Sequence, residues 1–408
     1  MGHVKRVLTS SIPGSGCSKP RQLLWNDLCL TSFPQQLDSE STKLMHRWFF
    51  DISDALFPPQ FCSKFDIVKS TWVNCVLADE ASSYVDLFER RPGISSKALH
   101  HISKAYALVN LKLSGPESVS DSAIAAVVTL TIYQQIHQQH STGLIHLNGL
   151  YRMIQLRGGI ARLIKENRAL ALKPLRLDVE LALQNGSPLF CSDAVPVNAV
   201  SEDSRVTKEQ LPSTAPWLSR IMLDVVNFAS LLNRREREGR TKLDPLNYTE
   251  TLLSLLYRLI EAAPLGQSRS MSGGLYGDVA HLAMLAFMTT LLPEYGSDHS
   301  SYLLLSNRLE SAIRDFHVTS ADTPDSELSL LLWTLFISGV SVLKRKDHRW
   351  LSLLILETCE RLGLYDWPAV RHQLCEFPWI HTLHDVPARC LWEDASVAAL
   401  RFHESSYN

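Results

Sequence analysis

The stretch IAAVVTLTIYQQIHQQHSTGLIHLNGLYRMIQLRGGIARLI, from Ile124 to Ile164, decides the fold class. Apolar residues in its first half recur at four-residue steps: Ile124, Val128, Ile132 and Ile136. Apolar residues in its second half follow the spacing i, i+3, i+7: Leu147, Leu150 and Ile154. Both spacings line one face of an α-helix, and Gly158-Gly159 is a natural end for the second one. The stretch therefore predicts two consecutive amphipathic helices.

The same helical spacing continues on both sides of this stretch. A third stripe runs from Leu351 to Leu362 and ends at Gly363. The longest apolar run, Leu328 to Leu343, predicts a buried helix. Further helices are predicted near 41–57, 94–113, 172–185, 217–235, 248–262, 277–292, 300–316 and 326–343. Alternating strand patterns are scarce, so we predict an all-α fold, a large helical bundle or array.

Two irregular stretches divide the chain. Residues 1–40 mix Gly, Pro and Ser without sustained periodicity and are interpreted as a flexible N-terminal segment. Residues 185–216 are rich in Pro, Ser and Asp and are interpreted as a long irregular loop. We therefore expect one helical domain over 41–402, built from two halves, 41–185 and 217–402.

Composition and charge exclude several classes of protein. The 408 residues are 45% hydrophobic and 20% charged, which is typical of a globular chain rather than a disordered one. The 40 basic and 42 acidic residues give a net charge of −2. A surface that binds DNA directly needs an excess of basic residues, which this composition lacks. The longest apolar run is shorter than the ~20 residues of a membrane span. We expect a soluble, intracellular protein with no membrane partner.

The motifs of common enzymes are missing from the sequence. There is no GxSxG elbow, no GxGxxG or GxxxxGK phosphate loop and no HExxH zinc helix. The eight cysteines stand at least 12 residues apart, so no CxxC pair is present for zinc or redox chemistry. We expect no enzyme activity, no catalytic residue, no metal site and no cofactor.

Two groups of histidines leave an alternative open. His137 and His140 are interpreted as lying three apart on one helix, with His146 following, and His381, His384 and Asp385 form a second group. Either group could hold a metal or a reactive centre, but neither has a third ligand or a nucleophile at the required spacing. Surface or helix-capping roles are the favoured interpretation for the first group, and a structural role is favoured for the second.

The Ile124–Ile164 stretch resembles the regulatory region of fungal zinc-cluster transcription factors, the fungal-specific transcription factor domain. In that family an apolar helix precedes a His-Leu-x-Gly-Leu…Arg-Gly-Gly core. The matching residues in this sequence are His146, Leu147, Gly149, Leu150, Arg157, Gly158 and Gly159.

The resemblance continues over about residues 40–395. Arg176-Leu-Asp178 with Pro188-Leu-Phe190 is similar to the family's Arg-x-Asp helix and Pro-x-Phe turn. Trp333 and Gly339 fall in its Leu-rich helix. Its C-terminal pattern is matched by Trp350, Leu362-Gly363-Leu364, Trp367, Phe377-Pro-Trp379, His384 and Trp392.

Packing alone predicts structural roles for these motif residues. Gly149 is expected to let two helices approach, and Arg157 to cap carbonyls at a helix end. Gly158 is expected to supply a turn with positive φ. Trp350, Trp367 and Trp379 are expected in the core or at helix interfaces.

The sequence departs from the family in its DNA-binding half. Members carry a six-cysteine cluster that binds two zinc ions and reads the major groove, and this sequence has no such cluster. The resemblance therefore implies a nuclear, or nuclear and cytoplasmic, transcriptional regulator that reaches DNA only indirectly. It would act through a DNA-bound protein partner or a small-molecule effector, on a set of genes for a specialised pathway.

Two alternatives remain open at this level. The chain could be a helical enzyme or small-molecule-binding protein on the same fold, with a pocket formed by His146 and Arg157 or by His381, His384 and Asp385. A zinc cluster could also be encoded upstream of Met1.

Overall fold

The protein is all-α in the part that the structure describes. This computed structural model describes residues 57–63, 103, 106–107, 109–137, 139–190, 216–238, 242–266, 274–292, 302–318, 324–343 and 349–406. Its main helices are α7 (Asp121–Ile136), α8 (His140–Leu156), α9 (Ile160–Glu166), α10 (Arg168–Asn185), α11 (Pro216–Glu238), α12 (Pro245–Ala262), α13 (Gly274–Thr289), α14 (Leu303–Val318), α15 (Asp325–Val340), α16 (Arg349–Arg361), α17 (Trp367–Leu374) and α18 (His381–Ser406). Within these ranges there is no β-strand, only an isolated bridge between Cys62 and Leu243.

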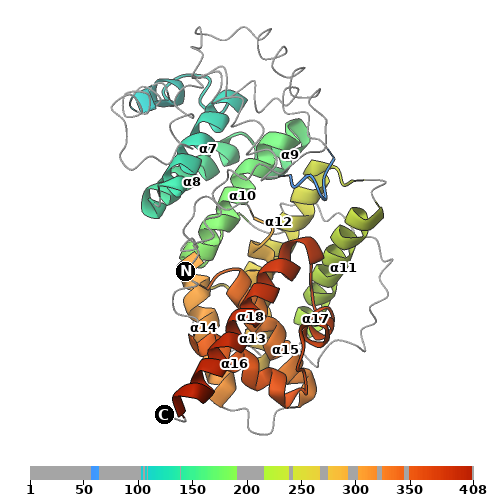
Figure 1. The fold of residues 1–408 in the computed structure, drawn as a ribbon. Helices are drawn as coiled ribbons and strands as arrows, with labels where there is room; N and C mark the ends of the chain where they lie inside the picture. Colours follow the sequence, from blue (N-terminus) through green and yellow to red (C-terminus); the bar gives the residue numbers. More distant parts are fainter. Residues whose placement is uncertain are drawn as a thin grey trace, which may run out of the picture.

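Helix α10 joins two groups of helices. On one side it packs against α7, α8 and α9, and on the other against α12 and α14 (Figure 1). The remaining helices gather around α13 and α15 in the lower part of the view. A single apolar core extends through both groups, from Phe57 to Ala395.

The α7–α8 hairpin forms because each helix has one continuous apolar face. Ile124 and Val128 of α7 are fully buried, as are Leu147 and Leu150 of α8. The helices meet closely at Gly143, where an added Cβ would lie 3.6 Å from the Cβ of Gln134. Ser120 begins α7 by accepting a hydrogen bond from the Ala123 amide at 3.2 Å.

Helices α13 and α15 are apolar on nearly all sides and form the centre of the larger group. Every residue of α15 from Leu328 to Ser338 is buried, which confirms the predicted buried helix. Trp333 at its middle stacks on Phe377 and donates its indole N–H to the Pro378 carbonyl at 3.0 Å. This hydrogen bond satisfies the indole inside the core.

Gly339 lets three helices come together near the end of α15. A Cβ at this position would lie 2.6 Å from Cδ2 of Leu391 in α18 and 3.0 Å from Cδ2 of Leu351 in α16. Only a residue without a side chain fits this approach in the native packing.

The structure confirms the all-α prediction and most of its predicted helices. Three helices were not predicted: α9, α17 and α18. One placement was wrong, because α7 ends at Ile136 and α8 begins at His140, so His137 and His140 do not share a helix. The proposed flexible segment 1–40 and most of the helix near 41–57 lie outside the described residues, as does 191–215 of the proposed loop. No helix in the described part is long and apolar enough to cross a membrane.

Candidate functional site

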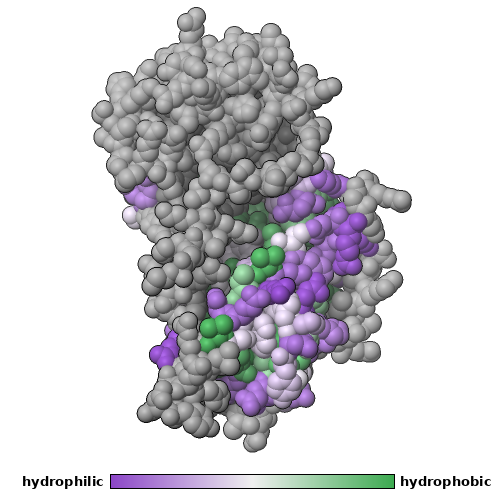
Figure 2. Space-filling model, viewed as in Figure 1, coloured by the Kyte–Doolittle hydropathy of each residue, from purple (hydrophilic) through white to green (hydrophobic). Residues whose placement is uncertain are grey.

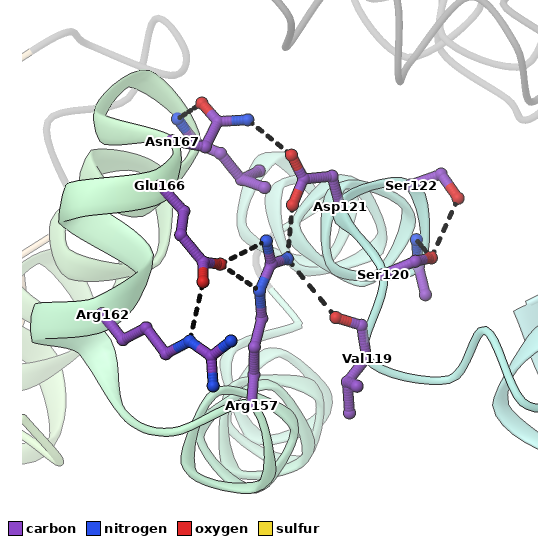
Figure 3. Close-up of polar contacts among 10 residues, drawn as sticks. Val119, Ser120, Asp121, Ser122, Arg157, Arg162, Glu166 and Asn167 are labelled. Carbon is purple, nitrogen blue, oxygen red and sulfur yellow. Dashed lines mark hydrogen bonds and ion pairs between the residues drawn. The ribbon is translucent and has the colours of Figure 1, made fainter.

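Arg157 is the centre of a polar cluster that joins α7, α8 and α9 (Figure 3). It stands at the C-terminal end of α8, and its side chain is largely buried. The guanidinium donates to Asp121 in the first turn of α7. It also donates to Oε2 of Glu166 at the end of α9, at 2.9 and 3.1 Å. The same side chain reaches the Val119 carbonyl at 3.4 Å, so one residue connects three helices.

The cluster continues into the start of α10. The second oxygen of Asp121 accepts a hydrogen bond from Nδ2 of Asn167 at 2.8 Å, and Oδ1 of Asn167 accepts from the Leu170 amide (Figure 3). Asn167 therefore caps α10 while it contacts α7. Hydrogen bonds from Arg162 and Arg157 lower the pKa of Glu166, so this carboxylate stays ionised in the fold.

This geometry corrects two of the expected roles. Arg157 does not cap the carbonyls that end α8; it pairs with carboxylates from neighbouring helices and with the carbonyl that precedes α7. Gly149 does not allow a close helix approach, because its position is exposed and an added Cβ would meet nothing within 4 Å. The buried glycine of this helix is Gly143, near its start, where an added Cβ would be in ordinary contact with the Cβ of Gln134 at 3.6 Å.

The expectation for Gly158 is confirmed. Its φ is 108°, and Gly159 follows with φ 91°. Side chains other than hydrogen are strained at such angles, so the two glycines allow the chain to reverse between α8 and α9. The reversal brings Glu166 back to Arg157.

His146 and Arg157 do not form a common pocket. The imidazole Nε2 of His146 contacts the Tyr106 hydroxyl at 3.4 Å, and that hydroxyl accepts from Nε2 of Gln134 at 2.6 Å. Burial lowers the pKa of His146, which favours its neutral form. Arg157, three helical turns away, has the separate partners described above.

Asp178 holds the turn that follows α10. Its buried carboxylate accepts hydrogen bonds from the backbone amides of Leu189 and Phe190, at 2.8 and 2.9 Å. Tyr257 of α12 donates to the same carboxylate at 2.8 Å. Burial raises the pKa of Asp178 to about 6. The Arg-x-Asp and Pro-x-Phe pieces of the sequence pattern are thus parts of one hydrogen-bonded structure.

Arg176, the other residue of this pattern, is a buried ion-pair partner. Its Nε lies 3.0 Å from Oε1 of Glu180, one turn further along α10, and both side chains are almost fully buried. Burial raises the pKa of Glu180, and the guanidinium beside it opposes that shift.

A second polar cluster forms around Asp385 where the chain enters α18. Arg371 of α17 donates to Oδ2 of Asp385 at 2.8 Å, and the indole of Trp379 donates to Oδ1 at 2.7 Å. The same guanidinium lies 3.0 Å from Nδ1 of His381. Although burial opposes ionisation, the hydrogen bonds from Arg371 and Trp379 hold the pKa of Asp385 below its ordinary value.

His384 is buried and caps the start of α18. Its Nδ1 accepts from the Ile380 amide at 3.0 Å, so the ring proton belongs to Nε2, which faces the Thr290 hydroxyl at 3.0 Å. Burial lowers the pKa of His384 to about 3, so the imidazole is neutral in the fold. The ring stabilises a helix end, which is a structural role of the kind expected for this histidine group.

Asn233 of α11 is a contact residue that sequence reasoning missed. Its amide nitrogen donates to the Trp379 carbonyl at 2.6 Å, and its oxygen accepts from the His381 amide at 3.0 Å. No local pattern marks it, because its partners lie far along the chain. Asp121 did carry a signal, since it follows the helix-capping Ser120.

Three tryptophans of the pattern, Trp350, Trp367 and Trp379, lie in the core or at helix interfaces. The guanidinium of Arg314 in α14 lies 4.6 Å from the ring centre of Trp350 in α16. Trp367 begins α17 and contacts the ring of Phe336 in α15. Trp379 is buried, with its ring 5.0 Å from that of His384. The expected core and interface roles are confirmed for these three residues.

Both the Arg157 cluster and the Asp385 cluster link helices through paired charges.

Among the described residues, no group of three or more His, Cys, Asp or Glu side chains could hold a metal ion. Cys62 and Cys359 are buried free thiols, Cys375 is half-buried and Cys390 is exposed. Apart from the exposed Gly149, the pattern residues described above lie at helix ends or in interhelical contacts.

Comparison of this chain with protein-family models, with curated proteins and with solved structures finds no match.

Proposed function

We propose that this protein is a transcriptional regulator of the type formed by the regulatory regions of fungal zinc-cluster factors, acting through a protein partner that is bound to DNA. The observation that carries the proposal is the ordered series of pattern residues from His146 to Trp379. Members of this series contact one another or lie side by side in the fold. Arg157 and Gly158 form the junction between α8 and α9, and Asp178 accepts a hydrogen bond from the Phe190 amide in the turn after α10.

The composition supports indirect action on DNA. A net charge of −2 does not supply the phosphate-neutralising excess that unaided DNA binding requires. The cysteine spacing excludes a zinc cluster in this sequence. A regulator of this kind works in the nucleus, and a set of genes for a specialised pathway is the target that the resemblance suggests.

Tethering the chain to DNA tests the proposal directly. The full chain is fused to an unrelated DNA-binding domain and expressed with a reporter gene that carries the matching operator. We expect the reporter level to change relative to the DNA-binding domain alone. Deletion of the gene in its own organism should also change transcript levels of a defined gene set.

Two variants serve as matched controls. Asp178→Ala removes a buried hydrogen-bonded carboxylate. It should destabilise the fold and so abolish the change in reporter level. Gly149→Ala changes an exposed position with nothing nearby and should retain the effect. An unchanged reporter together with unchanged transcripts in the deletion strain would contradict the proposal.

A further inference from the structure

We draw no further inference here: the strongest candidate, the surface patch along α18 where Val386 and Val397 are exposed and Figure 2 shows hydrophobic groups separated by hydrophilic ones, carries no proposal, because nothing in the part of the chain that the structure describes shows what covers it.

Discussion

The hydroxyl of Tyr257 donates a hydrogen bond of 2.8 Å to the carboxylate of Asp178, inside the core and between helices α12 and α10. The same carboxylate accepts two backbone amides from the turn after α10. The carboxylate of Asp178 thus connects three parts of the fold: its own helix α10, the neighbouring helix α12 and the turn that follows α10. It joins two pieces of the sequence pattern that are eleven or twelve residues apart.

Removing this acid should destabilise the fold strongly. We expect Asp178→Asn to cost about 2–4 kcal/mol, because its amide group cannot accept the hydrogen bonds that the second carboxylate oxygen takes. Tyr257→Phe should cost about 1–2 kcal/mol, since it removes one donor only. Urea denaturation measures both, with the exposed Glu360→Gln as a control. Equal stability of Asp178→Asn and this control would contradict the account.

Gly149 within α8 and Gly158 just after it should respond differently to substitution. Gly158→Val should cost about 1–3 kcal/mol, because a β-branched residue is strained at a φ of 108°. Gly149→Ala should be neutral or stabilise by up to about 1 kcal/mol, since alanine favours a helix and meets no neighbour here. Thermal unfolding of the two variants compares them. A destabilising Gly149→Ala would show that this face of α8 is covered.

A side chain at Gly339 should destabilise the fold unless the neighbouring Leu391 becomes smaller. Gly339→Ala places a Cβ 2.6 Å from Leu391 and should cost about 1–3 kcal/mol through overpacking. Leu391→Ala in the same chain should relieve that clash, so the two effects should be clearly non-additive. A double-mutant cycle from urea unfolding measures this coupling, and simple additivity would contradict the close approach.

Arg157 should couple three helix ends. Arg157→Lys keeps the charge but cannot reach Asp121 and Glu166 together, so we expect a loss of about 1–2 kcal/mol. Hydrogen exchange should accelerate at the start of α7 and in α9 before the rest of the fold. Arg162→Lys, at an exposed position that contacts Glu166 alone in this cluster, is the matched control and should have a smaller effect. Uniform acceleration across the chain would argue against a local junction.

Acid should destabilise the protein through His384. The fold lowers the pKa of this imidazole from 6.5 to about 3, whereas an unfolded chain protonates it near 6.5. The unfolded state therefore gains a proton first, and stability falls as the pH drops from about 6.5 towards 3. The slope from this group approaches ~1.4 kcal/mol per pH unit. His384→Asn should reduce the slope of the unfolding free energy against pH by that amount. Equal slopes for the variant and the unmodified protein would contradict the lowered pKa of His384.

Prediction from sequence was most accurate where apolar residues repeat at helical spacing over several consecutive turns. The stripes of α7, α8 and α16 were visible because several turns repeat one spacing, and Gly158 and Gly363 marked helix ends by their backbone freedom. The seven-residue α9 was missed because two turns carry too little periodicity. In α18, Pro387 and mixed polarity hid the pattern.

The amino-acid order by itself determined the helical class, the buried helix at α15 and the positive φ at Gly158, because each depends on neighbours a few residues away. Only the tertiary structure decided which polar groups meet. Asn233 donates a hydrogen bond to the carbonyl of Trp379, 146 residues further along the chain. Arg157 forms ion pairs with Asp121 and Glu166. The same packing leaves Gly149 exposed and fills the space around Gly339. The physical reason is that such contacts depend on how whole helices settle against one another, which no short window of sequence records.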